Sequence, residues 1–319
     1  MMLSLRFKCT SMKQALLNLV IFFTLFFAAD VAAQEQFPLY PDGKIPNARV
    51  AKDTEEHKAD PSVDSLAFNV SVPSLTVFIP KSTAANGTAV IICPGGGYHV
   101  LLTKREGSDA ARAFNKLGIT AFVFKYRLPS ERTMEDKATG PLQDVQQAIK
   151  VVRENAKKWG LSPGKIGIMG YSAGGHLASL AGTHFADPKI ENKARTSLRP
   201  DFMLLINPVI SFTDRIGHRG SRDNYLGPGP SAEKIRYFSS ELQVTEQTPP
   251  AFLVHSDADQ VVPVANSLEF YQALKSKGVP VGLHIYTKGE HGFLTAPSFE
   301  EWFGRCIYWM RSMSMTSAL

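Results

Sequence analysis

The sequence contains little cysteine, no internal repeat and, beyond its N-terminus, no long apolar run. Cys9, Cys93 and Cys306 are the three cysteines among 319 residues, and no combination of cysteine and histidine has the spacing of a zinc site. Cys93 ends an apolar run, so we expect a buried free thiol there and not a disulfide bond. The missing repeat argues against a solenoid or a propeller. The missing run of about 18 apolar residues argues against a bundle of membrane helices.

Charge of one sign is not concentrated anywhere in the chain. The 35 lysines and arginines exceed the 29 acidic residues by six, and they form no cluster of the kind that binds nucleic acid. Hydrophobic residues make up 44% of the chain, which is too many for a disordered protein and ordinary for a globular one. We therefore expect a globular protein without a nucleic-acid partner.

The first 33 residues have the pattern of a secretory signal peptide. Three basic residues precede an apolar run at 15–29, and small residues occupy positions 31–33. An uncleaved membrane anchor is the less favoured alternative, because the run is shorter than the roughly 20 residues that span a bilayer. We expect cleavage after Ala33, a periplasmic or extracellular location, and no membrane association of the mature protein.

Residues 34–65, rich in proline and charge, are predicted to form an irregular arm, and residues 66–319 a single catalytic domain. In that domain strand-like and helix-like stretches alternate, which indicates an α/β fold with a mostly parallel sheet and helices on both faces. A stretch at about 210–250, rich in glycine and proline, is predicted to be a lid or binding insert. The predicted strands are 75–79, 89–93, 120–126, 165–169, 202–206, 252–255 and 282–286, and the predicted helices 108–117, 142–159, 173–180, 264–277 and 298–311.

A Gly-x-Ser-x-Gly motif at 170–174 follows a predicted strand and opens a predicted helix. This context is the one in which a sharp turn exposes the central serine, and the glycines remove side chains that would obstruct the turn. The N-terminus of the following helix also favours negative charge. The motif therefore predicts that Ser172 is a nucleophile.

A serine nucleophile needs a general base, because its hydroxyl group is weakly nucleophilic at neutral pH. His291 lies in a loop after the predicted strand 282–286, and α/β proteins place catalytic groups at that edge of the sheet. We therefore expect His291 to be the base. We expect His255 to make a structural hydrogen bond and His176 to pack against the sheet.

The base in turn needs a carboxylate that orients it and stabilises its protonated form. Asp257 and Asp259 both lie in the loop after the predicted strand 252–255. Residues two apart point in different directions, so only one of them can fill the role. The residues alone do not decide between the two.

Three consecutive glycines at 95–97 follow the predicted strand 89–93. Their backbone N–H groups can turn toward a developing negative charge without obstruction by side chains. Together with the N–H of Ala173, directly after the nucleophile, they are candidate oxyanion donors, each worth about 3 kcal/mol of barrier. An ordinary glycine turn is the alternative.

With these motifs the chain resembles the α/β-hydrolase superfamily, and within it the bacterial secreted carbohydrate esterases related to acetyl xylan esterases and to hormone-sensitive-lipase-like enzymes. The resemblance extends over nearly the whole mature chain and is most specific at 170–177. It implies an α/β-hydrolase fold. Two departures concern Pro94, where the family often has a histidine before the glycines, and Ala258, which separates two acids that are often adjacent. The site residues implied by position are Ser172 as nucleophile, His291 as base, Asp259 before Val-Val-Pro as acid, and Gly96, Gly97 and Ala173 as oxyanion donors.

The resemblance implies a secreted serine esterase that hydrolyses ester-linked acyl groups, and O-acetyl groups first of all, on a polysaccharide or oligosaccharide. An acylated carbohydrate is the expected partner, and neither a metal nor an organic cofactor is expected. The alternatives are a feruloyl or other aryl esterase, a serine peptidase of the prolyl-oligopeptidase type, and, least favoured, a non-catalytic carbohydrate-binding protein. The insert carries Tyr225, Tyr237 and Phe238, which we expect to pack within it and not to stack on sugars.

Overall fold

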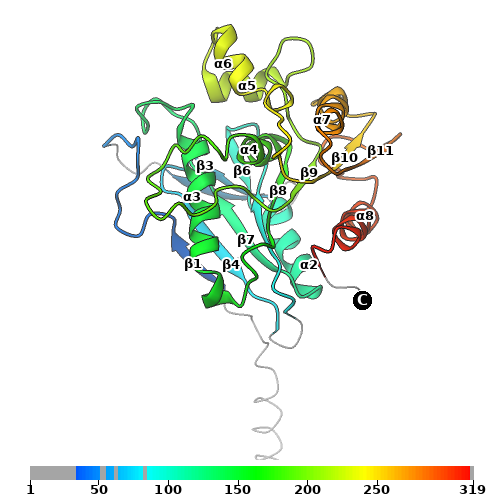
Figure 1. Cartoon of the computed structure of the whole chain (residues 1–319). Coiled ribbons are helices and arrows are strands. Elements are labelled where there is room, and N and C mark those ends of the chain that lie inside the picture. Colours follow the sequence, from blue (N-terminus) through cyan, green and yellow to red (C-terminus); the bar gives the residue numbers. More distant parts are fainter. Residues whose placement is uncertain (1–33, 51–54, 61–63, 82–84, 317–319) are drawn as a thin grey trace, which may run out of the picture. The chain divides into compact units, whose positions relative to one another are not determined.

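A computed structural model of the chain describes residues 34–50, 55–60, 64–81 and 85–316 (Figure 1). The predicted signal peptide lies outside these residues. Eight strands form one sheet in the order β1-β4-β7-β5-β8-β9-β10-β11. The bounds of its strands are β1 Glu35–Pro38, β4 Ser74–Phe78, β5 Ala89–Cys93, β7 Thr120–Lys125, β8 Ile166–Tyr171, β9 Met203–Ile206, β10 Ala251–Ser256 and β11 Val281–Tyr286.

Most of this sheet is parallel. The pairs β1·β4 and β4·β7 are antiparallel, and every other neighbouring pair is parallel. The central strands β5 and β8 are buried along their whole length, as expected for strands covered on both faces. The predicted mostly parallel sheet is therefore confirmed. The ends of the strands predicted from apolar runs agree with the observed ends to within two residues, and 89–93 coincides with β5.

Helices cover both faces of the sheet, as predicted. On one face, Ile149 of α3, Leu177 of α4 and Phe270 of α7 share an apolar core. On the other face, Phe114 of α2 and Phe303 of α8 belong to a second core. The alternating side chains of each strand contribute to the two cores in turn. The helix bounds are α2 Ala110–Lys116, α3 Gly140–Glu154, α4 Ser172–Thr183, α5 Arg219–Leu226, α6 Ala232–Tyr237, α7 Ala265–Ser276 and α8 Phe299–Ser312, with shorter turns η1 Lys104–Asp109, η2 Ala156–Trp159 and η3 Ser240–Leu242.

The N-terminal arm, expected to be irregular, contains two strands. β1 pairs with the edge strand β4 of the main sheet. β2 (Glu56–Asp60) pairs with β3 (Asp64–Phe68), which also pairs with β6 (Val100–Leu102) in a second, three-stranded sheet. Both arm strands are mostly exposed, and β1 contains one core-facing residue, Phe37, so neither sequence has the apolar alternation that marks a strand. β1 is ordered by hydrogen bonding to a strand far away in the sequence, whereas β2 pairs with β3, the next strand along the chain.

The stretch at 210–250 is not a continuous loop, because it contains α5, α6 and η3, of which α5 and α6 lie at the top of Figure 1. Of its aromatic side chains, Tyr225 and Phe238 are buried and Tyr237 is partly exposed. Tyr225 is fully buried, with ring centroids 4.7 Å from Tyr98 and 5.1 Å from Phe238. The Tyr237 hydroxyl donates to a carboxylate oxygen of Asp187 (2.8 Å). The rings therefore pack against the body of the protein as well as within the insert.

Two further predictions concern cysteine and membrane helices. Cys93 and Cys306 are both buried free thiols, as expected for Cys93, and burial raises the pKa of each thiol. In the part of the chain that the structure describes, none of the helices has both the length and the apolar character needed to cross a bilayer.

Candidate active site

The turn between β8 and α4 holds Ser172 in a strained backbone conformation. Its φ angle is +50°, a left-handed value that non-glycine residues rarely adopt outside functional sites. The glycines of the motif make the turn possible. A Cβ atom on Gly170 would lie 2.1 Å from the carbonyl oxygen of Gly174, and one on Gly174 would lie 2.1 Å from that of Cys93. The motif therefore keeps the strand, the turn and the helix in direct backbone contact.

The structure brings Ser172, His291 and Asp259 together. The Ser172 hydroxyl oxygen lies 2.8 Å from His291 Nε2, and His291 Nδ1 lies 2.6 Å from Asp259 Oδ2. The serine and histidine are 119 positions apart in the sequence. A neutral imidazole satisfies all three groups when its Nδ1–H donates to the carboxylate and its Nε2 accepts from the serine hydroxyl. This is the tautomer that a general base needs.

The Asp259 carboxylate is held from several sides. Its Oδ1 accepts hydrogen bonds from the backbone N–H groups of Val261 and Val262, each at 2.9 Å. Burial by itself raises the Asp259 pKa, but the hydrogen bonds from His255, His291 and the Val262 N–H outweigh it and hold that pKa well below its usual range. Asp259 is therefore ionised in the folded protein at neutral pH.

Asp257 does not reach the histidine. Its side chain is exposed, and its backbone N–H donates to the carbonyl oxygen of Tyr286 (2.7 Å). The sequence did not decide which of the two acids orients His291. The direction in which the loop after β10 turns decides it. Asp259, the one implied by the family resemblance, is the one in contact with His291.

The two other candidate histidines are fully buried. His255 Nδ1 contacts the Ser267 hydroxyl (2.8 Å), its Nε2 contacts the Val262 carbonyl oxygen (3.0 Å), and this nitrogen is also 3.3 Å from Asp259 Oδ2. The expected structural hydrogen bond is present, and His255 in addition supports Asp259.

His176 does not pack against the sheet, which corrects our expectation. Its Nδ1 lies 2.8 Å from the Tyr98 hydroxyl, and its ring stacks on Phe212 with centroids 4.0 Å apart. Its place in α4 turns the ring toward the insert. Burial lowers the His176 pKa to about 3, so the ring stays neutral. His176 therefore links α4 to the insert and to Tyr98, which follows the three glycines.

Residues 94–98, which we call the glycine loop, lie against the serine turn. A Cβ atom on Gly95 would be 3.1 Å from the Ser172 Cβ, and one on Gly96 would be 2.0 Å from the Val100 carbonyl oxygen. Within the described ranges, the N–H groups of Gly96 and Gly97 donate to no protein acceptor. The Ala173 N–H is in the first turn of α4, where backbone donors have no partner inside the helix. All three N–H groups therefore remain candidate oxyanion donors, and Ala173 directly follows Ser172.

Sequence reasoning missed Glu106 and Tyr126, two of the side chains that support this loop. The buried Glu106 of η1 accepts a hydrogen bond from the Gly95 N–H through its Oε2 (2.8 Å). Burial raises the Glu106 pKa, opposed by Arg105 and by the Gly95 N–H. The Tyr126 hydroxyl donates to the Pro94 carbonyl oxygen (2.7 Å). These contacts support the loop where Pro94 stands in place of the histidine common in the family. No local sequence signal marks Glu106 as buried.

Replacing Glu106 by alanine should lower kcat for 4-nitrophenyl acetate about tenfold to hundredfold, with a smaller change in KM. Removal of the Glu106 carboxylate leaves the Gly95 N–H buried without an acceptor, and this loosens the loop that carries the Gly96 and Gly97 donors. Glu106→Gln keeps an acceptor oxygen and should recover most of kcat. Steady-state kinetics with thermal unfolding of each variant measures both effects. Wild-type kcat in Glu106→Ala would show that Glu106 does not position the loop.

One cavity adjoins the Ser172 turn and the His291 loop, and a second lies beside the glycine loop. The aromatic pocket, of about 360 Å³, is lined by Tyr171, directly before Ser172, by Gly292, directly after His291, and by Phe293, Phe299, Trp302, Arg105 and their neighbours. The other cavity, of about 230 Å³, is lined by Tyr98 and His99 at the end of the glycine loop. Within residues 34–316, gaps excepted, no three His, Cys, Asp or Glu side chains are grouped so as to hold a metal ion.

Residues 75–274 match the model of the BD-FAE family, a range that includes Ser172 and Asp259 and ends before His291. The chain belongs to the BD-FAE family. The acetyl ester-xyloside bifunctional hydrolase of Caldicellulosiruptor lactoaceticus superposes with a TM-score of 0.74 at 36% identity, covering 89% of this chain and 97% of that one. The predicted α/β-hydrolase fold, and the predicted relationship to acetyl xylan esterases, are thereby confirmed.

Two curated proteins are also similar to this BD-FAE chain. An acetylxylan esterase of Xylanibacter ruminicola is 37% identical over 234 residues, 72% of this chain and 44% of that protein. An endo-1,4-beta-xylanase B of Butyrivibrio fibrisolvens is 37% identical over 238 residues, 73% of this chain and 37% of that protein. The chain thus spans less than half the length of either relative.

Proposed function

We propose that this BD-FAE protein is an exported serine esterase that removes O-acetyl groups from xylan-type polysaccharides or their fragments. The observation that carries the proposal is the continuous hydrogen-bonded series from Ser172 through His291 to Asp259. The names of its relatives, an acetylxylan esterase and an acetyl ester-xyloside hydrolase, support the substrate class. The predicted signal peptide supports export.

The first half of the reaction acylates the enzyme. The Ser172 oxygen attacks the ester carbonyl carbon while its proton passes to His291 Nε2, 2.8 Å away. The carbonyl oxygen takes up negative charge as the carbon becomes tetrahedral, and the N–H groups of Gly96, Gly97 and Ala173 stabilise that charge. The intermediate collapses when His291 gives the proton to the departing sugar oxygen. The products are a free sugar hydroxyl group and an acyl group on Ser172.

The second half removes the acyl group. A water molecule gives a proton to His291 Nε2 and attacks the acyl carbon. The second tetrahedral intermediate then collapses as His291 returns that proton to the Ser172 oxygen, which releases the carboxylic acid and restores the Ser172 hydroxyl. In both halves His291 becomes positively charged for a moment. The ionised Asp259, 2.6 Å from Nδ1, stabilises that charge and keeps the ring in orientation.

The aromatic pocket favours a second candidate, an esterase that also accepts aryl acyl groups such as feruloyl. Its volume exceeds what an acetyl group fills, and Phe293, Phe299 and Trp302 supply apolar walls. The Tyr171 hydroxyl and the Arg105 Nε, both in its lining, are buried without a hydrogen-bond partner among the described residues. Oxygen substituents on an aromatic ring would satisfy such groups.

One assay series separates these functions. Mature protein is incubated with acetylated xylan, 4-nitrophenyl acetate, methyl ferulate and a proline-containing peptide, and the released acids or amines are quantified. We expect acetate from the first two substrates, and ferulate as well if the aromatic pocket accepts the acyl group. Cleavage of the peptide without ester hydrolysis would instead support a serine peptidase.

A further inference from the structure

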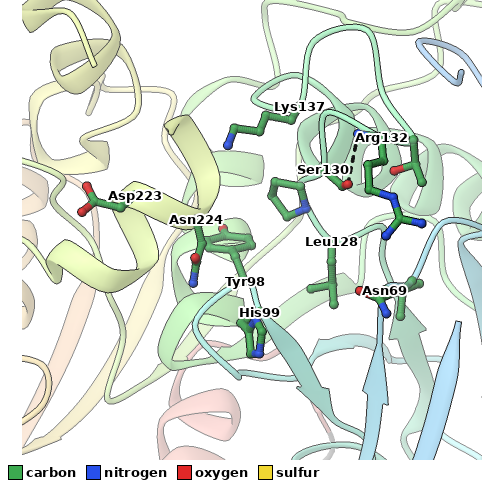
Figure 2. Close-up of a pocket in the computed structure, with 12 residues that line it drawn as sticks. Asn69, Tyr98, His99, Leu128, Ser130, Arg132, Lys137, Asp223 and Asn224 are labelled. Atoms are coloured by element: carbon green, nitrogen blue, oxygen red, sulfur yellow. Dashed lines mark hydrogen bonds between the residues drawn. The ribbon is translucent and has the colours of Figure 1, made fainter. Parts of the chain in front are cut away.

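Figure 2 shows the cavity of about 230 Å³ beside the glycine loop. Tyr98 and His99, which directly follow Gly97, form one wall, and Asn224 of α5 forms another. The side-chain amide of Asn224 donates to the Gly97 carbonyl oxygen (2.8 Å), so α5 and the glycine loop are joined at this point. A ligand in the cavity therefore lies next to the loop that carries two of the proposed oxyanion donors.

The third wall is residues 128–137, which contribute two cations, Arg132 and Lys137. Arg132 is exposed, and no ion pair among the described residues includes its guanidinium group. The Lys137 side chain is only 17% exposed, and it forms an ion pair at 3.7 Å with Glu131, whose well-exposed carboxylate lies outside the cavity lining. The single acid in the lining, Asp223, faces Arg219 and Arg222 at 3.5 Å each. The cavity therefore has an excess of positive charge.

This wall is fixed to the body of the protein. Arg127, directly before it, is fully buried and binds the buried Asp144 of α3 at 2.7 Å. Within the wall, Met134 is also buried and forms an isolated bridge with Ala48. The backbone that carries Arg132 and Lys137 is thus held in place before any ligand binds, which reduces the ordering cost of binding.

We propose that this cavity, the basic pocket, binds a uronic acid residue of the polysaccharide whose neighbouring sugar presents its ester to Ser172. The inference rests on the proposed function and names the substrate class more narrowly. A guanidinium group binds a planar carboxylate through paired hydrogen bonds, and a second cation strengthens the attraction. His99, Ser130 and Asn224 supply polar atoms for sugar hydroxyl groups. The volume is below the roughly 300–1,000 Å³ of pockets for drug-sized ligands, so it suits one sugar ring.

Binding is measured by calorimetry on Ser172→Ala protein, in which the ester stays intact. One ligand is an acetylated xylo-oligosaccharide with a single glucuronic acid branch, and the other is the neutral oligosaccharide of the same length. We expect the acidic ligand to bind about fivefold more tightly, with the advantage decreasing as salt is raised. Arg132→Gln and Lys137→Gln should each remove most of the advantage. Lys277→Gln, an exposed lysine at the end of α7, should keep it.

Equal affinity for the two ligands would overturn the inference, and so would an advantage that survives both basic-pocket variants. A sulfated oligosaccharide is the third ligand, and tighter binding of sulfate than of uronate would assign the pocket to a different anion. The result is independent of catalysis. A protein that hydrolyses acetyl esters without preferring the acidic ligand refutes the basic pocket alone. If the Ser172→Ala protein prefers the acidic ligand but the wild-type protein hydrolyses no ester, the proposed function alone is refuted.

Discussion

Ser172→Ala protein should hydrolyse 4-nitrophenyl acetate with kcat/KM about 10⁴- to 10⁶-fold below wild type. The variant loses the oxygen that attacks the carbonyl carbon, and His291 Nε2 loses the hydroxyl that lies 2.8 Å from it. The donors of the glycine loop stay in place, so a small residual rate remains. Alanine meets the same strain at φ +50° as serine does, so the unfolding temperature should change little.

A matched serine control is available on α7. The exposed Ser276 donates its hydroxyl to the carbonyl oxygen of Ala273 (2.7 Å), far in sequence from the motif. Ser276→Ala should keep wild-type kcat/KM. Steady-state kinetics and thermal unfolding of both variants complete the test. If Ser172→Ala kept most of the wild-type activity, Ser172 would not be the nucleophile.

Ser172 was predictable because the motif and its setting agree. An apolar run, a turn with glycines on both sides and a helical stretch are all local features, and each is visible in the sequence. The clash that a Cβ on Gly170 or Gly174 would cause explains why the pattern is so restrictive. His291 was predictable in the same way, since it follows a recognisable strand at the edge where parallel strands end.

The choice between Asp257 and Asp259 was not predictable from the residues. It depends on how the loop after β10 turns, and that turn is set by contacts between distant segments, such as the hydrogen bond from the Ser256 hydroxyl to the Gly289 carbonyl oxygen. Glu106 is a similar case. Burial of a carboxylate against a backbone N–H from another loop has no local signature, and neither has the pairing of the polar strand β1 with β4. Sequence patterns thus located the chemistry, and tertiary contacts determined its support.

Asp259→Asn should lower kcat/KM by about 10³- to 10⁴-fold, whereas Asp257→Asn should leave it within about twofold of wild type. An asparagine amide at position 259 can donate to His291 Nδ1, which stabilises the tautomer with its proton on Nε2. That tautomer cannot accept the Ser172 proton. Asp257 is exposed and does not contact His291, so its replacement controls for charge near the site. An equal loss in both variants would contradict the assignment of Asp259.

The same two variants test how the Asp259 carboxylate makes the stability of the protein depend on pH. The Asp259 pKa is held well below its usual range in the folded protein, while the unfolded chain has a value of about 3.9. The carboxylate therefore stabilises the fold fully above that unfolded value, and its contribution is lost as pH falls toward the folded pKa. The difference in unfolding free energy between wild type and Asp259→Asn, measured with urea, should shrink from pH 7 to pH 3. Asp257→Asn is measured alongside as the control for removing one exposed acid from the same loop. A difference for Asp259→Asn that is constant with pH would mean that its hydrogen bonds to His291 and the loop do not favour the ionised carboxylate.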